Sequence, residues 1–135
     1  SGIDDISLFQ LNTEGPNMIE QLESIQHNID NRLYQILLYH RPQDVKHYLE
    51  YGFDLMLSGH AHGGQWRIPF VLNGLLAPDQ GFFPKLAGGL YHFDAANLIV
   101  SRGLARESTI VPRIFNRPEL VFIDLSNASS NKSSN

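Results

Sequence analysis

The chain of 135 residues contains no cysteine, and its basic residues are the minority, with 10 Lys and Arg against 14 Asp and Glu. Without cysteine, disulfide-stapled folds and cysteine-ligated zinc sites are excluded, so any metal must be held by nitrogen and oxygen atoms. No apolar run approaches the roughly 20 residues that a membrane-spanning helix needs. No nucleic-acid partner is expected, because nucleic acid favours a basic surface. The remaining class is one globular domain, since 42% hydrophobic residues are enough for a core.

The chain is predicted to be helical near its amino end and disordered at its carboxyl end. From Thr13 to Asn28, apolar residues recur at the spacing of one helix face, and this helix is expected to begin near Pro16. Residues 127–135 are small or polar, which is typical of a disordered tail. Residues 1–126 are therefore expected to form the folded domain.

Two short apolar runs, Gln35–Tyr39 and Asp54–Ser58, are predicted to be buried strands. Between them, Pro42–Tyr51 is expected to form a helix. A crossover of about a dozen residues is too long for a hairpin, so the strands should be parallel, in a right-handed βαβ unit. An irregular segment is expected from Gln65 to Leu86. Short, mostly antiparallel strands should follow near Gly89–Phe93, Leu98–Ser101 and Leu120–Leu125.

Three histidines follow the two predicted parallel strands. His40 comes at the end of the first strand, His60 follows the second, and His62 lies two residues further on. The carboxyl ends of parallel strands meet at the edge where α/β sheets place their ligands, and residues two apart in an extended chain point to the same side. Gly63 and Gly64 permit a close backbone approach. One such histidine is more often a structural residue, but three at one edge indicate a metal site.

The residues alone leave the kind of metal site open. Three imidazoles are enough for a single zinc ion that activates water. Phosphate chemistry more often uses two ions and needs bridging carboxylates, and no acidic residue here lies in an Asp-x-His or Gly-Asp-x-x-Asp motif. The other histidines have no comparable arrangement and are expected to be exposed or structural: His27, His47 and His92.

A longer pattern around the three histidines resembles a known family. The string G-H-A-H-G-G-Q at 59–65, with a preceding strand that ends in His40, resembles the carboxyl-terminal half of the calcineurin-like metallophosphoesterases. It is most similar to the bacterial branch that carries G-H-T-H-G-G-Q. The likeness extends to S-R-G-L at 101–104 and R-I-F-N-R-P-E-L at 113–120, and covers nearly everything from Gly2 to Leu125. Ala61 replaces the usual Thr, which removes no ligand.

The resemblance implies a hydrolase of phosphate mono- or diesters that uses two divalent ions, Mn, Fe or Zn. His40 and His60 would bind the second ion and His62 the first, so that all three serve catalysis. Gly63 and Gly64 would leave room for the phosphate of the substrate. The implied ions activate water and neutralise the charge that develops at phosphorus.

The aspartate-rich motifs of the family's amino-terminal half are not in this sequence. The implied fold is therefore half of a four-layer αββα sandwich with an exposed apolar face. A chain with such a face should dimerise, swap elements with another copy or bind the missing amino-terminal half of the domain. With three ligands and no bridging carboxylate, this piece should bind metal weakly and be poorly active. For its location, the resemblance leaves open the bacterial cytoplasm, or membrane association or export through a missing amino-terminal segment.

A function from another class also fits the residues. The fold would then be a non-catalytic protein-interaction module, with the histidines as relics or as a structural metal site, although the presence of all three favours the hydrolase. Trp66, Phe82 and Phe83 are interpreted either as part of the substrate pocket or as loop packing. Arg102, Arg113 and Arg117 are candidates for phosphate contact, but solvation or a pair with Glu119 is the preferred interpretation for each.

Overall fold

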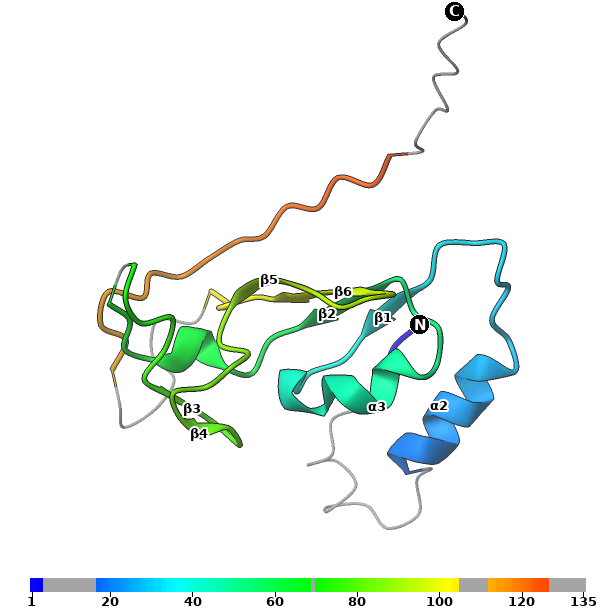
Figure 1. Cartoon of the computed structure of the whole chain (residues 1–135), viewed down its shortest axis with the longest axis horizontal. Coiled ribbons are helices and arrows are strands. Elements are labelled where there is room, and N and C mark those ends of the chain that lie inside the picture. Colours follow the sequence, from blue (N-terminus) through cyan, green and yellow to red (C-terminus); the bar gives the residue numbers. More distant parts are fainter. Residues whose placement is uncertain (4–16, 69, 105–111, 127–135) are drawn as a thin grey trace, which may run out of the picture.

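A computed structural model describes residues 1–3, 17–68, 70–104 and 112–126 of the chain (Figure 1). Its helical elements are α2 (Met18–Gln26), η1 (Pro42–Asp44), α3 (Val45–Leu49) and η2 (His62–Gly64), where η marks a 3₁₀ turn. Its strands are β1 (Ile36–Leu38), β2 (Leu55–Ser58), β3 (Leu76–Ala77), β4 (Gly81–Phe82), β5 (Gly89–His92) and β6 (Asn97–Val100). The predicted tail and residues 13–16 of the first predicted helix lie outside the described residues.

The main sheet is mixed and has the strand order β1-β2-β6-β5. β1 and β2 are parallel, as the length of the crossover predicted. β5 and β6 are antiparallel, also as predicted. β6 in addition pairs in parallel with β2, so the later strands extend the βαβ unit instead of forming a separate antiparallel group. The fold class is therefore α/β.

One face of the sheet forms the core of the molecule. Leu37, Met56 and Leu98 lie side by side in register, and their side chains are completely buried. Both α2 and α3 lie on this side of the sheet (Figure 1). The two helices contact each other through the Tyr48 hydroxyl, which donates to the Met18 sulfur at 3.2 Å.

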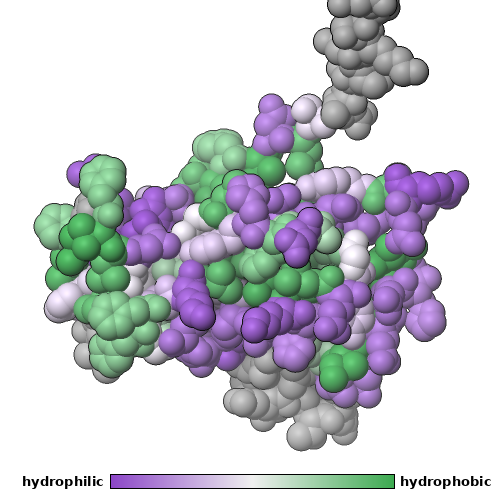
Figure 2. Space-filling view, in the orientation of Figure 1, coloured by the Kyte–Doolittle hydropathy of each residue, from purple (hydrophilic) through white to green (hydrophobic). Residues whose placement is uncertain are grey.

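The opposite face carries a row of apolar residues that crosses all four strands in register: Leu38, Leu57, Ile99 and Leu90. At the two ends of this row, Leu38 and Leu90 are 53% and 56% exposed. No helix in the described part of the chain covers this face (Figure 1), and hydrophobic side chains also reach the surface elsewhere (Figure 2). Among the described residues, helices therefore cover only one side of the sheet.

Local sequence explains where α2 begins, and the structure shows how far the second helix of the covered side extends. α2 begins after Asn17, whose side chain accepts from the Glu20 amide while the Glu20 carboxylate accepts from the Asn17 amide. This capping box satisfies two backbone donors at the first turn. The predicted helix Pro42–Tyr51 is shorter in the structure, because it opens as η1 and continues as α3 only to Leu49.

Two predictions about the later chain are wrong. Residues 120–125 form no strand, because no described strand lies beside them and an extended backbone becomes a strand only when a neighbour pairs with it. The segment from Gln65 to Leu86 is not wholly irregular, since β3 and β4 form an antiparallel pair within it. Each of these strands has only two residues, too few for an alternating pattern to be visible in the sequence.

None of the described helices has the length and apolar character needed to cross a membrane.

Candidate functional site

His40 and His60 meet at the carboxyl ends of the parallel strands β1 and β2, as the sequence predicted. The distance between His40 Nε2 and His60 Nδ1 is 3.0 Å. Their rings lie edge to face, with centroids 4.8 Å apart and planes at 71°. The two strands pair through Leu38 and Leu57, so the residues that follow leave the sheet side by side.

Asp79 completes this group from a distant part of the chain. Its Oδ2 atom lies 2.8 Å from His60 Nε2 and accepts from the Arg41 guanidinium at 2.6 Å. Asp79 lies in the turn between β3 and β4, and its backbone φ is +57°. Sequence reasoning missed this residue, because nothing in the local pattern of the turn shows which strand ends it faces.

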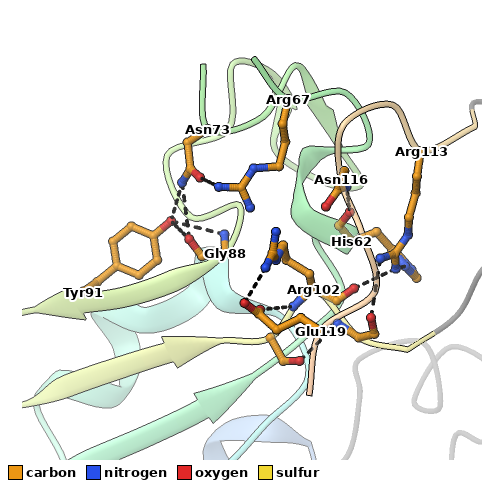
Figure 3. Close-up of polar contacts among 11 residues, drawn as sticks. His62, Arg67, Asn73, Gly88, Tyr91, Arg102, Arg113, Asn116 and Glu119 are labelled. Atoms are coloured by element: carbon orange, nitrogen blue, oxygen red, sulfur yellow. Dashed lines mark hydrogen bonds and ion pairs between the residues drawn. The ribbon is translucent and has the colours of Figure 1, made fainter. Parts of the chain in front are cut away.

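His62 has a different polar partner from those of His60. The chain was expected to be extended here, so that both rings would point to one side, but His60 and His62 have φ values of +60° and +47°, and η2 begins at His62. That expectation about the backbone is wrong. The Nδ1 atom of His62 lies 3.3 Å from a terminal nitrogen of Arg113 (Figure 3).

The environment of His62 favours its neutral form. Burial is the largest cause that lowers the pKa of His62 below its ordinary value, followed by the positive charge of Arg113. His60 and His40 lower this pKa further through their own charges. A neutral imidazole is the form that binds metal.

Two of the three histidines fit a shared metal ion. The 3.0 Å contact between His40 and His60 is a hydrogen bond between the two rings. It is also close to the roughly 3.0 Å that separates two nitrogens bound at about 2.1 Å and at a right angle to one octahedral ion, whereas a tetrahedral zinc ion would hold them about 3.4 Å apart. His62 does not fit in its present contact: a neutral imidazole has one lone-pair nitrogen, and Nδ1 of His62 faces a donor. Across the described residues, no three His, Cys, Asp or Glu side chains form a ready metal-binding group.

Gly63 and Gly64 allow the chain to pack closely after the histidines. Both residues have positive φ, at +66° and +67°, and both are buried. A Cβ atom on Gly63 would overlap the Asn116 amide, and one on Gly64 would overlap the backbone of Gly74. Packing therefore accounts for both glycines, and their contact with substrate stays a prediction.

The segment that contains Arg113 and Asn116 binds the loop that carries His62 and Gln65. Asn116 is 3% exposed and donates to the carbonyls of His62 and Gln65 at 2.6 and 3.1 Å. Arg113 also donates to the Arg102 carbonyl at 2.7 Å (Figure 3). The string at 113–120 that carried part of the resemblance is thus a clamp on the loop. The family resemblance drew attention to this string, but nothing in the sequence showed that its residues hold the loop after His62.

Arginine side chains gather next to His62. Arg102 pairs with Glu119 at 2.6 Å, which confirms the preferred interpretation for this arginine. The hydrogen bond from Arg102 is the largest cause that lowers the pKa of Glu119. Burial, and after it the charge of Arg102, lower the pKa values of both Arg67 and Arg113. The local charge is therefore positive, while Arg117 is exposed.

Two open grooves border the group of His40, His60 and Asp79. One, of about 610 Å³, reaches from His40 along the ends of β1 and β2 to Gly2. The other, of about 530 Å³, lies between the helical crossover and the β3–β4 turn, and its lining includes Phe82, Phe83, Lys46 and Asp79. Asp79 thus lies both beside His60 and in the wall of the second groove.

Comparison with known proteins finds similar chains in bacteria. The chain is 34% identical over 98 residues to the uncharacterized metallophosphoesterase YkuE of Bacillus subtilis, covering 72% of this chain and 32% of that protein. It is 33% identical over 101 residues to the UDP-2,3-diacylglucosamine pyrophosphatase LpxG of Chlamydia muridarum, covering 69% of this chain and 29% of that protein. It is 32% identical over 93 residues to the phosphodiesterase YaeI of Escherichia coli, covering 69% of this chain and 33% of that protein.

The chain thus spans about a third of the length of these curated relatives. No protein-family model matches it, and no solved structure does.

Proposed function

The chain belongs to the calcineurin-like metallophosphoesterase superfamily, and from that premise we propose that its parent protein hydrolyses phosphate mono- or diesters. The observation that carries the proposal is the contact between His40 and His60, whose facing nitrogens are spaced as two ligands of one ion would be. Relatives named as a phosphodiesterase and a pyrophosphatase support a hydrolase over a protein-interaction module.

We propose His40 and His60 as ligands of one divalent ion, and His62 as a ligand of a second. Mn, Fe and Zn are the candidate ions, because imidazole suits Fe and Zn, and carboxylates from the rest of the domain would suit Mn. When bound, the ions would polarise the phosphate ester and activate water. For His62 to bind, its contact with Arg113 must first be released.

The surroundings of the histidines suit an anionic substrate. The positive charge of the cluster of Arg67, Arg102 and Arg113 would attract a phosphate group towards His62, while Arg102 keeps its pair with Glu119. Gly63 and Gly64 would let the backbone approach that phosphate. The groove with Phe82 and Phe83 would receive an apolar part of the ester.

The uncovered sheet face supports a place for this chain within a larger domain. We propose that the row from Leu38 to Leu90 packs against a second sheet, which would complete a four-layer αββα sandwich. The second sheet would come from the amino-terminal half of the same domain and would bring the missing carboxylate ligands. Alone, this chain would bind metal weakly and hydrolyse little.

The hydrolase proposal is tested with the full-length parent protein. Turnover of p-nitrophenyl phosphate and bis(p-nitrophenyl) phosphate is measured with and without Mn²⁺, in the wild type and in His60→Gln and His47→Gln. We expect metal-dependent turnover that His60→Gln lowers at least about 100-fold, whereas His47→Gln, an exposed residue of α3, leaves it unchanged. Absence of turnover with any divalent ion would remove the proposal.

A further inference from the structure

We propose that Asp79 is a positioning residue of the candidate metal site: its carboxylate fixes the His60 ring so that Nδ1, the nitrogen facing His40, is left to bind a metal. The inference rests on the proposed function for the metal itself. The orientation of His60 follows from contacts of this chain alone.

The first argument is the pairing of atoms around His60. Its Nε2 atom lies 2.8 Å from Asp79 Oδ2, and its Nδ1 atom lies 3.0 Å from His40 Nε2. An ionised carboxylate only accepts hydrogen bonds, so the ring nitrogen that faces it carries the proton. In a neutral imidazole the lone pair is then on Nδ1. Asp79 thereby selects the tautomer in which Nδ1 accepts from the Nε2–H group of His40. A metal ion bound between the two rings would take the place of that proton.

The second argument is the backbone at Asp79. The amide of Gln80 donates to the Ala77 carbonyl at 3.3 Å, which places Asp79 at the third position of a four-residue turn. Its φ is +57°, and this position favours Gly or Asn. Aspartate tolerates this conformation, so the turn can hold the Asp79 carboxylate in a fixed position.

The third argument is that both sides of the turn are anchored. Arg41, which directly follows His40, donates to the same Asp79 oxygen at 2.6 Å. On the other side, the Gln80 side chain donates to the Leu86 carbonyl and accepts from the Leu86 amide, both at 3.1 Å. The carboxylate is therefore held against the His60 ring by two separate parts of the fold. Carboxylates that accept from the far nitrogen of a metal-binding histidine orient its ring and raise its basicity.

The decisive variant is Asp79→Asn, because Asn suits the positive φ of the turn but its amide presents either an acceptor or a donor to Nε2. Asp94→Asn is the matched control: it makes the same change of charge at an exposed aspartate between β5 and β6. Circular dichroism of each variant checks that the fold is kept.

The first readout is the tautomer of His60 in the metal-free chain, from long-range ¹H–¹⁵N correlations of the imidazole rings. Loss of one set of signals in His60→Gln assigns the ring. We expect the Nε2-protonated tautomer in the wild type and in Asp94→Asn, and a shift towards a mixture of tautomers in Asp79→Asn. An unchanged tautomer in Asp79→Asn overturns the inference, since a merely structural residue would not set it.

The second readout is the affinity of the same chain for Zn²⁺, by calorimetric titration. Asp79→Asn is expected to weaken binding about 10- to 100-fold, with no change in Asp94→Asn. If His60→Gln weakens binding and Asp79→Asn does not, the inference fails while the metal site stands. If His60→Gln binds Zn²⁺ like the wild type, the proposed metal site fails and the inference with it.

Arg41→Gln provides an independent test if Asp79→Asn does not fold. It removes one anchor of the carboxylate but leaves Asp79 in place. We expect the same direction of change in both readouts, with a smaller size. Wild-type behaviour of Arg41→Gln in both readouts would then overturn the inference.

Discussion

At the scale of single residues, Glu119 illustrates how a neighbour sets the charge of a side chain. Its pKa is lowered chiefly by the hydrogen bond from Arg102, so the folded state binds protons less readily than the unfolded state does. The stability that this pair contributes is present above the unfolded pKa of Glu and is lost as the pH falls through the lower, folded pKa. Acid should therefore weaken the contact between residue 119 and the arginine cluster.

We predict that Glu119→Gln lowers the free energy of unfolding at neutral pH by on the order of 1 kcal/mol, because it removes a charge-assisted hydrogen bond. The difference from the wild type should begin to shrink as the pH falls below the ordinary pKa of Glu, about 4.3, and should vanish only below the lowered pKa of the folded state. Urea denaturation at several pH values measures both. A difference that is independent of pH would contradict the assigned charge of Glu119.

At the scale of elements, the 3₁₀ turn after His60 depends on close packing between two backbones. Gly64 has positive φ, and a Cβ there would overlap the backbone of Gly74. Gly52, after α3, also has positive φ, at +78°, but a Cβ there would meet nothing within 4 Å. Substitutions at these two glycines therefore distinguish the cost of backbone strain from the cost of overlap between atoms.

We predict that Gly52→Ala costs about 1 kcal/mol of stability, from backbone strain alone. Gly64→Ala should cost a further amount on the order of 1–3 kcal/mol, because backbone atoms cannot move aside as a side chain can. Chemical denaturation of both variants gives the comparison. Equal losses would show that the approach of Gly64 to Gly74 does not constrain the loop.

At the scale of the whole molecule, the uncovered sheet face decides how the chain behaves alone. The row Leu38, Leu57, Ile99 and Leu90 crosses every strand of the sheet, and its two ends are more than half exposed. Apolar surfaces of this kind drive association when nothing covers them. We therefore keep the prediction that the 135-residue chain self-associates.

Sedimentation velocity over a range of concentrations tests this prediction. The wild type should form dimers or larger species, and the double variant Leu38→Lys with Leu90→Lys should be monomeric, because two charges would have to be buried on association. Ile19→Lys is the matched control, since Ile19 is similarly exposed, at 55%, but lies on α2. A monomeric wild type, or equal loss of association in the control, would contradict a role for the sheet face.

Much of the fold follows from local sequence. Apolar runs indicated β1 and β2, the crossover between them indicated their parallel direction, and helix-spaced apolar residues indicated α2. The cap of α2 at Asn17 was identified only in the structure. That His40 and His60 meet follows from the same information, because each lies two residues beyond the end of one of two paired strands. The resemblance to the metallophosphoesterases also lies in contiguous strings of sequence.

Other features depend on contacts between distant segments and were decided only by the tertiary structure. Three features are of this kind: the position of β6 beside β2, the lack of any described strand beside residues 120–125, and the turn of the chain at His62. So is Asp79, which reaches His60 through a two-stranded turn that no hydrophobic pattern marks. A sequence records which residues are neighbours along the chain, whereas the nitrogen that faces a carboxylate is set by how separate segments pack.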